Sequence, residues 1–267
     1  MSSPFLLHDV IDHVAVLTLN RPDKLNALTF ELYADLRDAI MQAQGNPEVR
    51  AILLTGAGRG FCAGADMRAL ESATKTAGDE KHGVPGPSGD TMTMSYLPAI
   101  RKPIIAAVNG VAVGLGFVLA MFADVRFSSE SAMFMTSFAT RGLVAEDGIS
   151  WLLPKVIGHS KAMDLLLSGR AVRGEEALSM GLVSRVLKDD ELFDHALDYA
   201  RSMAKNCSPR SMDIIKRQVW NDHEKSYSGS VDVSIALLHE AFTTDDFKEG
   251  VQHHLERRPA NFQGLMV

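Results

Sequence analysis

Two adjacent carboxylates, Glu146 and Asp147, stand in a turn with Gly148, inside an otherwise apolar segment between Phe138 and Trp151. A carboxyl group in apolar surroundings has a raised pKa, which suits it to give and take a proton near neutral pH. Acidic residues are also common at the start of a helix, where the helix dipole favours negative charge. The residues alone support both interpretations equally, a proton-transfer site and an ordinary helix start.

The stretch 53–67, LLTGAGRGFCAGADM, could hold negative charge with its backbone. An apolar run is followed by Gly56, Gly58 and Gly60, and small residues then lead to an expected helix start at Asp66. Glycine adopts positive φ angles and has no side chain to block a ligand. Free N–H groups at a helix start favour developing negative charge. This pattern predicts an anion or oxyanion site made of backbone.

Other kinds of site fit the sequence poorly. A dinucleotide fingerprint would need glycine where Phe61 stands, and no Gly-Lys-Ser/Thr follows to make a phosphate loop. Cys62 is either a nucleophile or a small apolar residue packed under the turn, and the packing role is favoured. His239 lacks the second histidine of a zinc motif, and the pair His253-His254 lies on a polar helix. No metal site is predicted.

The first two thirds of the chain alternates strand and helix patterns. The segment 29–43 has helical spacing, with an apolar face and Thr29 as its N-cap; that face consists of Leu32, Leu36, Ala39 and Ile40. A helix between two strands favours a right-handed parallel crossover. Buried strands are expected at Val14–Leu19, 51–54, Ile104–Val108, 125–128 and 132–138.

A second unit of strand, glycine turn and helix resembles the first. The strand Ile104–Val108 leads into the turn 109–116, NGVAVGLG, and then into an apolar helix at 116–122. Between the two units, residues 72–90 are polar and rich in Gly and Pro, which predicts a long loop of the kind that often serves as a lid. The last third is nearly all helix, with helices expected at 161–167, Gly174–Met180, 192–205, 208–222, 233–243 and Asp245–Glu256.

Size and composition limit the function further. A chain of 267 residues with 46% hydrophobic and 22% charged residues is large enough for one globular α/β domain with a helical appendage. Its formal charge of −6 argues against nucleic-acid and membrane partners, which need a basic surface. Two cysteines make no disulfide framework and no targeting segment is visible, so we expect a cytoplasmic protein.

Several long motifs, in order, resemble the enoyl-CoA hydratase/isomerase (crotonase) family, from about residue 14 to residue 262: GAGRGFCAGADM, PIIAAVNGVAVGLGFVLAMFADVRF, MDLLLSGRAVRGEEALSMGLVSRVL and EGVQHHLERRPANF. The resemblance implies an α/β fold, a crotonase-like spiral of ββα units with a C-terminal helical region. It implies a core at 1–200 with the acyl-CoA site and a trimerisation region at 201–267. The expected assembly is a homotrimer or a dimer of trimers. Coenzyme A would enter as part of the substrate, with no permanently bound cofactor.

By the same resemblance, the backbone N–H groups of Ala65 and Leu115 form an oxyanion hole for the thioester oxygen. Leu115 stands where glycine is often found, but its N–H is retained. The coenzyme A path would be lined by Lys24, Leu25, Ala27, Ala63, Asp66 and Met67, with Arg257 reaching a phosphate on a neighbouring subunit. The loop 72–90 and an apolar pocket would select the acyl group; that pocket consists of Met94, Phe117, Val118 and Phe138.

The departures from the family pattern are as informative as the matches. Hydratases of the family hold and activate water with two glutamates, and the matching positions here are Val118 and Phe138. Neither side chain can bind or deprotonate water, so hydration by that pair is not expected. Glu146 takes the place of a carboxylate found in some members in a GLVPDGG turn, with Asp147 as a second acid or orienting partner.

This pattern predicts double-bond isomerisation through an enolate. The alternatives are hydrolysis or retro-Claisen cleavage of a β-dicarbonyl acyl-CoA, hydration by Glu146, and a non-catalytic acyl-CoA binder. An RNA-binding role, seen in some relatives, would need a basic patch, and this sequence has none.

Overall fold

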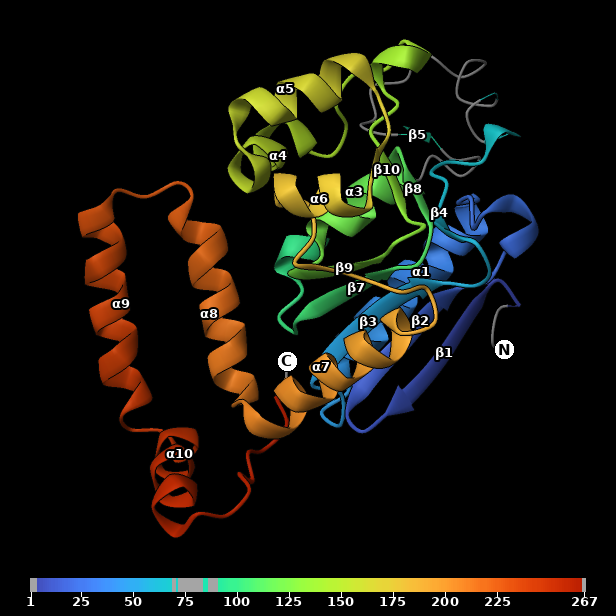
Figure 1. The fold of residues 1–267 in the computed structure, drawn as a ribbon. Coiled ribbons are helices and arrows are strands. Elements are labelled where there is room, and N and C mark those ends of the chain that lie inside the picture. Colours follow the sequence, from blue (N-terminus) through green and yellow to red (C-terminus); the bar gives the residue numbers. More distant parts are fainter. Residues whose placement is uncertain (1–3, 69–70, 72–83, 86–90, 266–267) are drawn as a thin grey trace.

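The computed structural model describes residues 4–68, 71, 84–85 and 91–265, and contains two main β-sheets (Figure 1). The larger sheet is six-stranded, in the order β1-β2-β3-β7-β9-β12, and all of its strands after β1 pair in parallel. Its strands are β1 (Leu6–Ile11), β2 (Val14–Leu19), β3 (Ala51–Gly56), β7 (Ile104–Val108), β9 (Val125–Ser129) and β12 (Arg185–Leu187). The parallel pairing of β2 with β3 across a helix confirms the expected crossover.

The smaller sheet is four-stranded, in the order β11-β10-β8-β4. Its strands are β4 (Gly60–Cys62), β8 (Val111–Val113), β10 (Met133–Met135) and β11 (Val172–Arg173). A two-stranded ladder pairs β5 (Val84–Pro85) with β6 (Thr91–Met92). The predicted loop 72–90 otherwise lies outside the described residues.

The helices cover the sheets and form the last third of the chain. The α-helices that lie within the described residues are α1 (Phe30–Gly45), α3 (Leu115–Phe122), α4 (Ile149–Ile157), α5 (His159–Ser168), α6 (Gly174–Met180), α7 (Leu192–Asn206), α8 (Pro209–Asp222), α9 (Tyr227–Ala241) and α10 (Asp245–Glu256). Short 3₁₀ turns are η1 (Pro22–Lys24), η2 (Leu97–Ala99) and η3 (Ala139–Arg141). A further helical segment starts at Met67, one residue after the expected start.

Three successive ββα units build the fold, which confirms the expected α/β spiral. β3 and β4 precede the helical segment at Met67, β7 and β8 precede α3, and β9 and β10 precede η3 and α4. In each unit the first strand joins the larger sheet and the second joins the smaller one. The sequence pattern predicted the first two units as strand, turn and helix, because strands of three residues inside glycine turns leave little periodicity to detect.

Several further elements differ from the sequence prediction, and strands β11 and β12 and helix α4 were not predicted. Strand β1 was not predicted; most of its residues are exposed at the edge of the sheet, so it carries no clear apolar alternation. Helix α9 starts at Tyr227 rather than at 233, with Ser226 as its N-cap accepting from Gly229 N–H. Helix α1 was predicted correctly: Thr29 Oγ1 accepts from Leu32 N–H at 3.2 Å, and the predicted apolar face is buried.

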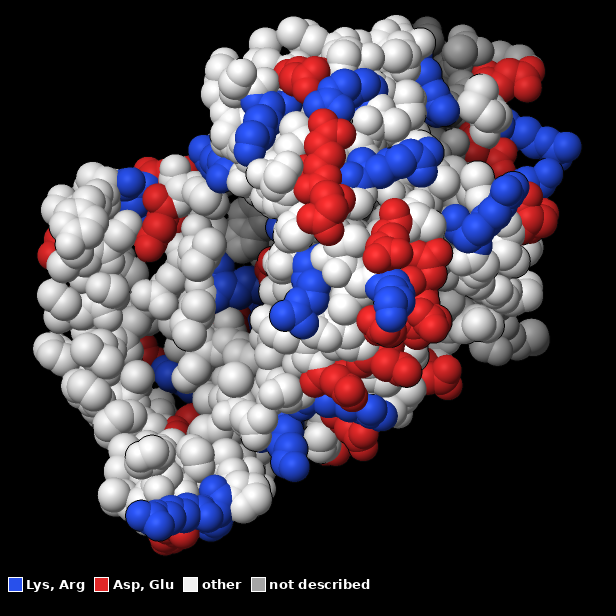
Figure 2. Space-filling model, viewed as in Figure 1, with Lys and Arg blue, Asp and Glu red and all other residues white. Residues whose placement is uncertain are grey.

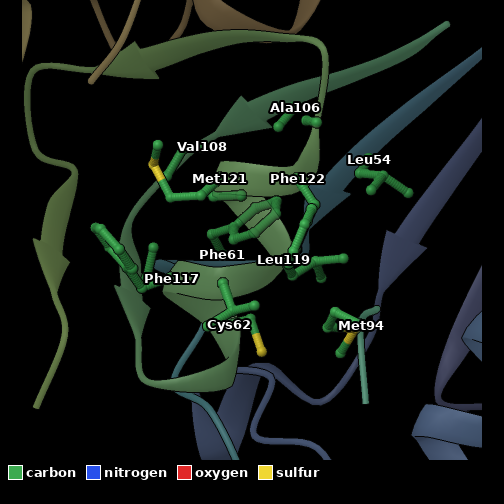
Figure 3. Close-up of a cluster of buried hydrophobic side chains, with 14 of the residues drawn as sticks. Leu54, Phe61, Cys62, Met94, Ala106, Val108, Phe117, Leu119, Met121 and Phe122 are labelled. Atoms are coloured by element: carbon green, nitrogen blue, oxygen red, sulfur yellow. The ribbon is translucent and has the colours of Figure 1, made fainter. Parts of the chain in front are cut away.

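The core is densest around α3, all of whose residues are buried (Figure 3). Cys62 lies among these apolar side chains and is fully buried, and burial raises the pKa of its thiol to about 12. A thiol with so high a pKa is a poor nucleophile at neutral pH, so Cys62 is a packing residue.

Helices α8, α9 and α10 form an arm that extends away from the sheets (Figure 1). Two ion pairs fasten α8 to the body: Arg101 with Asp213 at 2.6 Å, and Lys216 with Asp124 at 2.8 Å. No residue of α9 or α10 is buried, and the visible surface of the arm carries few charges (Figure 2). Among the described residues, no helix combines the length and apolar character needed to cross a membrane.

Candidate active site

The candidate site lies where three parallel strands of the smaller sheet end. β4 pairs with β8 and β8 pairs with β10, all in parallel. The carboxyl ends of these strands therefore meet at one edge of the sheet, the usual place for ligand sites in open parallel sheets. Ala65 follows β4, Leu115 follows β8, and Glu146 follows β10 after the 3₁₀ turn η3. The topology thus explains why residues so distant in the sequence meet here.

The backbone around Ala65 leaves one N–H group outside the regular pairing. Leu28 forms an isolated parallel bridge with Ala65, in which Leu28 N–H donates to Gly64 O at 2.7 Å and Asp66 N–H donates to Leu28 O at 2.8 Å. Successive peptide groups in an extended chain point to opposite sides. The N–H of Ala65 is therefore directed away from Leu28.

Leu115 is the first residue of α3, so its N–H has no acceptor within the helix. The two segments come together closely at Gly64, which has a φ of +89°. A Cβ added there would lie 3.4 Å from Leu115 N and only 2.6 Å from Val113 O. Glycine is therefore required at position 64, both by its conformation and by the contact between the two units.

One small cavity joins these groups to the acidic turn. Its lining consists of Gly64, Ala65, Gly114, Leu115, Phe138, Arg141, Leu143 and Glu146. Burial, and secondarily the charge of Asp147, raise the pKa of Glu146 from 4.5 to about 7. The cavity thus has a carboxyl group suited to proton transfer at neutral pH beside two backbone segments with N–H groups at a turn and at a helix start.

Asp147 is placed differently from Glu146. It does not line the cavity, and its carboxylate is held by Thr93 Oγ1 and by Met94 N–H, the latter at 3.1 Å. Both acids precede α4, where Ile149 N–H donates to Glu146 O at 2.9 Å. The two interpretations of this turn are therefore compatible in space, since it stands at a helix start and also borders a cavity.

The four expected acyl-pocket residues are buried, but only one borders the small cavity. Phe138 lines it, whereas Met94, Phe117 and Val118 are fully buried in the core. Val118 and Phe138 stand where the resemblance places the two hydratase glutamates, and neither can ionise. Of the described residues that line this cavity, Glu146 is the one with a carboxyl group.

A larger groove lies next to the cavity and collects most of the residues expected along the coenzyme A path. It is lined by Arg21, Lys24, Ala27, Thr29, Phe30, Ala63, Ala65, Asp66, Met67, Arg68 and Arg141. Its cationic residues outnumber its single carboxylate, Asp66, which pairs with Arg21 at 3.2 Å. Such a lining suits a phosphate-bearing ligand.

Leu25 and Arg257 lie outside the groove lining, whereas Arg141 lies in it and was not expected. Leu25 is outside the groove lining, but its carbonyl accepts from Ala63 N–H at 2.9 Å and so supports the groove wall. Arg257 caps α10 in the arm, outside the lining of the same chain's groove. Arg141 borders both the groove and the cavity and was missed from the sequence. A lone arginine in a 3₁₀ turn gives no pattern signal, and only the folded chain brings it to this position.

Among the described residues, no group of three or more His, Cys, Asp or Glu side chains is arranged to hold a metal ion.

Comparison with known proteins gives a consistent result. A sequence model described as enoyl-CoA hydratase/isomerase matches residues 10–265. The chain is 34% identical to 1,2-epoxyphenylacetyl-CoA isomerase from Escherichia coli, over 97% of this chain and 98% of that protein. It is 36% identical to a probable enoyl-CoA hydratase from Mycobacterium tuberculosis, over 93% of this chain and 89% of that protein.

Solved structures agree with the sequence comparisons. A probable enoyl-CoA hydratase/isomerase from Mycobacterium abscessus aligns with a TM-score of 0.87 at 31% identity, over 97% of this chain and 99% of that chain. An enoyl-CoA hydratase from Bacillus anthracis aligns with a TM-score of 0.87 at 28% identity, over 98% of this chain and 100% of that chain. With its spiral of ββα units and a family match that spans nearly the whole chain, this protein belongs to the enoyl-CoA hydratase/isomerase family.

Proposed function

We propose that this acyl-CoA enzyme moves a double bond in its substrate, between the β,γ and the α,β positions, with Glu146 as the proton carrier. The observation that carries the proposal is the cavity lining: Glu146 borders the same space as Ala65 and Leu115, while Val118 and Phe138 replace the hydratase glutamates. Such a site retains the means to stabilise an enolate and lacks the usual means to activate water.

In this mechanism the N–H groups of Ala65 and Leu115 hold the thioester oxygen. The Glu146 carboxylate takes a proton from Cα, and the electron pair of the broken C–H bond moves into a dienolate whose charge lies on that oxygen. Glu146 then returns the proton at Cγ, which leaves the double bond between Cα and Cβ. One oxyanion donor stabilises such a transition state by about 3 kcal/mol.

The pKa of Glu146 fits both steps. A single group that acts first as base and then as acid works best when its pKa is close to the working pH. Burial and the neighbouring charge of Asp147 bring that pKa to about 7. We therefore assign proton transfer to Glu146 and an orienting role to Asp147, whose carboxylate is engaged by Thr93 and Met94.

For coenzyme A we propose the groove beside the cavity. Lys24 and Arg141 would face its phosphates, and Ala27, Ala63, Asp66 and Met67 would form the walls. Arg257 would reach a phosphate only from a neighbouring subunit. This proposal is supported by the basic lining and by its continuity with the cavity through Ala65 and Arg141.

The direct test is a panel of β,γ-unsaturated acyl-CoA thioesters with linear, branched and cyclic acyl groups. The wild-type protein should convert at least one member to its α,β isomer without adding water. Glu146→Gln should lower that rate by about 10²- to 10⁴-fold. Full turnover by Glu146→Gln would refute the assignment.

Two other activities use the same site and give different products. Hydrolysis or retro-Claisen cleavage of a β-dicarbonyl acyl-CoA would place oxygen-18 from labelled water in a carboxylate product, whereas isomerisation would not. Hydration by Glu146 would yield a hydroxyacyl-CoA. The relatives do not separate these activities, because the Escherichia coli protein is named an isomerase and the Mycobacterium tuberculosis protein a hydratase. A non-catalytic binder would show thioester binding by calorimetry and no product from any member of the panel.

We also propose a homotrimer or a dimer of trimers, and a cytoplasmic location. The assembly is supported by the apolar residues that the arm exposes, among them Ile235 and Leu238 of α9 and its C-cap residue Phe242. Free Cys62 and Cys207 are consistent with a reducing compartment.

A further inference from the structure

Thr93 lies outside the cavity but contacts the second acid of the catalytic turn. Its Oγ1 donates to Asp147 Oδ1, and the next backbone N–H, that of Met94, donates to Asp147 Oδ2 at 3.1 Å. Both oxygens of the carboxylate are therefore engaged by two consecutive residues. A carboxylate held at both oxygens keeps one orientation, because neither oxygen can rotate away without losing a hydrogen bond.

The proton of Thr93 is available for this contact. A hydroxyl group has one proton to donate and two lone pairs to accept with. Ser95 N–H donates to Thr93 Oγ1 at 3.2 Å, and Ser95 Oγ lies 2.8 Å away. Since a carboxylate is a stronger acceptor than a serine hydroxyl, the Thr93 proton goes to Asp147 and the Ser95 hydroxyl donates to Thr93.

The segment that holds Asp147 is itself fixed to the body of the protein. Tyr33, a buried residue of α1, donates its hydroxyl proton to Thr93 O at 3.0 Å. Met94 is fully buried in the core. Thr93 thus connects the acidic turn to helix α1, across more than fifty residues of sequence in each direction.

The geometry of the turn makes such a support necessary. Asp147 has a φ of 50° and Gly148 a φ of 73°, so two successive residues are in the left-handed region. Aspartate tolerates this region better than most residues, at some cost in free energy. Hydrogen bonds to its side chain hold the residue there and keep its charge beside Glu146.

In the part of the chain that the structure describes, two charged groups stand out beside Glu146. From its own turn, Asp147 raises the pKa of Glu146, second in effect to burial. From η3, Arg141 lines the same cavity, and the other cavity residues are uncharged. After burial, the position of the Asp147 carboxylate therefore contributes to the raised pKa of Glu146.

We propose that Thr93 is a positioning residue of this site: through its hydrogen bond it fixes the carboxylate of Asp147 beside Glu146, the group that reacts with substrate. This inference rests on the proposed function only in naming Glu146 as the proton carrier. The contacts themselves are independent of the substrate. Thr93 touches neither the cavity nor the groove and acts through Asp147 alone.

The test is a carbon-13 NMR titration of the Glu146 carboxyl in the full-length protein labelled at glutamate, with the signal assigned by its loss in Glu146→Gln. Thr93→Val keeps the shape of the side chain and removes the hydroxyl. It should lower the titration midpoint of Glu146 below about 7, because Asp147 then keeps only the Met94 N–H bond and is held less firmly beside Glu146, while burial still holds the midpoint above 4.5. Thr93→Ser keeps the hydroxyl and should retain the wild-type midpoint.

Asp147→Asn should lower the midpoint of Glu146 as well. The double variant Thr93→Val/Asp147→Asn should have the same midpoint as Asp147→Asn alone, because Thr93 acts only through that carboxylate. An unchanged midpoint in Thr93→Val, or in Asp147→Asn if the valine variant does not fold, overturns the inference. A loss of stability in Thr93→Val with no change of midpoint would show a structural role only. The titration needs no substrate, so its result does not depend on whether the protein isomerises any acyl-CoA.

Discussion

At the scale of single residues, the proposed chemistry depends on one carboxyl group in an unusual environment. Glu146 borders a small, mostly apolar cavity, and its pKa is raised to about 7. The sequence predicted the acidic turn, because two adjacent acids in an apolar segment are conspicuous. The family resemblance favoured Glu146 over Asp147, but the residues alone gave no physical reason, because the contacts of Asp147 with Thr93 and Met94 depend on the folded chain.

The raised pKa predicts the pH dependence of the rate. The free enzyme must hold Glu146 as a carboxylate to accept the Cα proton, so kcat/KM for a β,γ-unsaturated acyl-CoA should rise with pH through about 7 and then level off. A rate that falls across this range would mean that Glu146 acts first as an acid. Steady-state kinetics between pH 5 and pH 9 distinguishes these outcomes. In Asp147→Asn, where we expect a lower pKa for Glu146, the rise in kcat/KM should occur at lower pH.

The same shift predicts an effect on stability. Because the folded state raises the pKa of Glu146 above 4.5, it binds more protons than the unfolded state between pH 4.5 and about 7, and stability is lost as pH rises through this window. Glu146→Gln removes the ionisable group. Its urea midpoint should exceed that of the wild type at pH 8, and the difference should shrink at pH 5. Equal differences at both pH values would contradict the shift.

At the scale of elements, short strands and helix starts carry the site. β4, β8 and β10 have three residues each, and the site follows their carboxyl ends. The glycine-rich turns of the sequence indicated the segments that follow β4 and β8. Gly64 and Gly116 lie in these segments and allow two stretches of backbone to touch. A Cβ added at Gly116 would lie 1.9 Å from Cys62 O, a contact that only a glycine permits.

One substitution can remove a single proposed oxyanion donor. Leu115 is the first residue of α3, the position where proline is best tolerated in a helix, so Leu115→Pro should fold while losing the N–H together with the buried leucine side chain. The matched control is Leu115→Ala, which shortens the buried side chain but keeps the N–H. We expect kcat of the proline variant to fall about 100-fold below that of the alanine variant. Equal kcat values in the two folded variants would exclude Leu115 as a donor.

At the scale of the whole molecule, the chain consists of a sheet body and an arm of three helices. Most of the body was predictable, because parallel strands are continuous apolar runs and helices such as α1 have clear apolar faces. Strand β1, Thr93 and Arg141 were not predictable, because their positions depend on contacts between segments far apart in the sequence. The arm exposes large apolar residues, among them Leu238, Phe242 and Leu255.

The exposed apolar surface of the arm predicts self-association. Leu238 and Phe242 are about half exposed, at 52% and 49%. Replacing both with Asp should convert a trimer or hexamer to smaller species, because a charge is costly to bury in an apolar interface. Light scattering after size exclusion measures the change, and Asp232→Asn on the same helix serves as the control. A wild-type monomer would contradict the proposed assembly.

The central claim is that Glu146 takes a proton from Cα of a thioester whose oxygen is held by Ala65 and Leu115. Proton NMR in deuterated water measures this step directly, with saturated acyl-CoA thioesters that can form an enolate but cannot isomerise. The wild-type protein should incorporate deuterium at Cα, and the rate of incorporation by Glu146→Gln should be at least about 100-fold lower. If bound thioesters gained no deuterium with the wild type, or gained it equally fast with Glu146→Gln, the claim would be wrong.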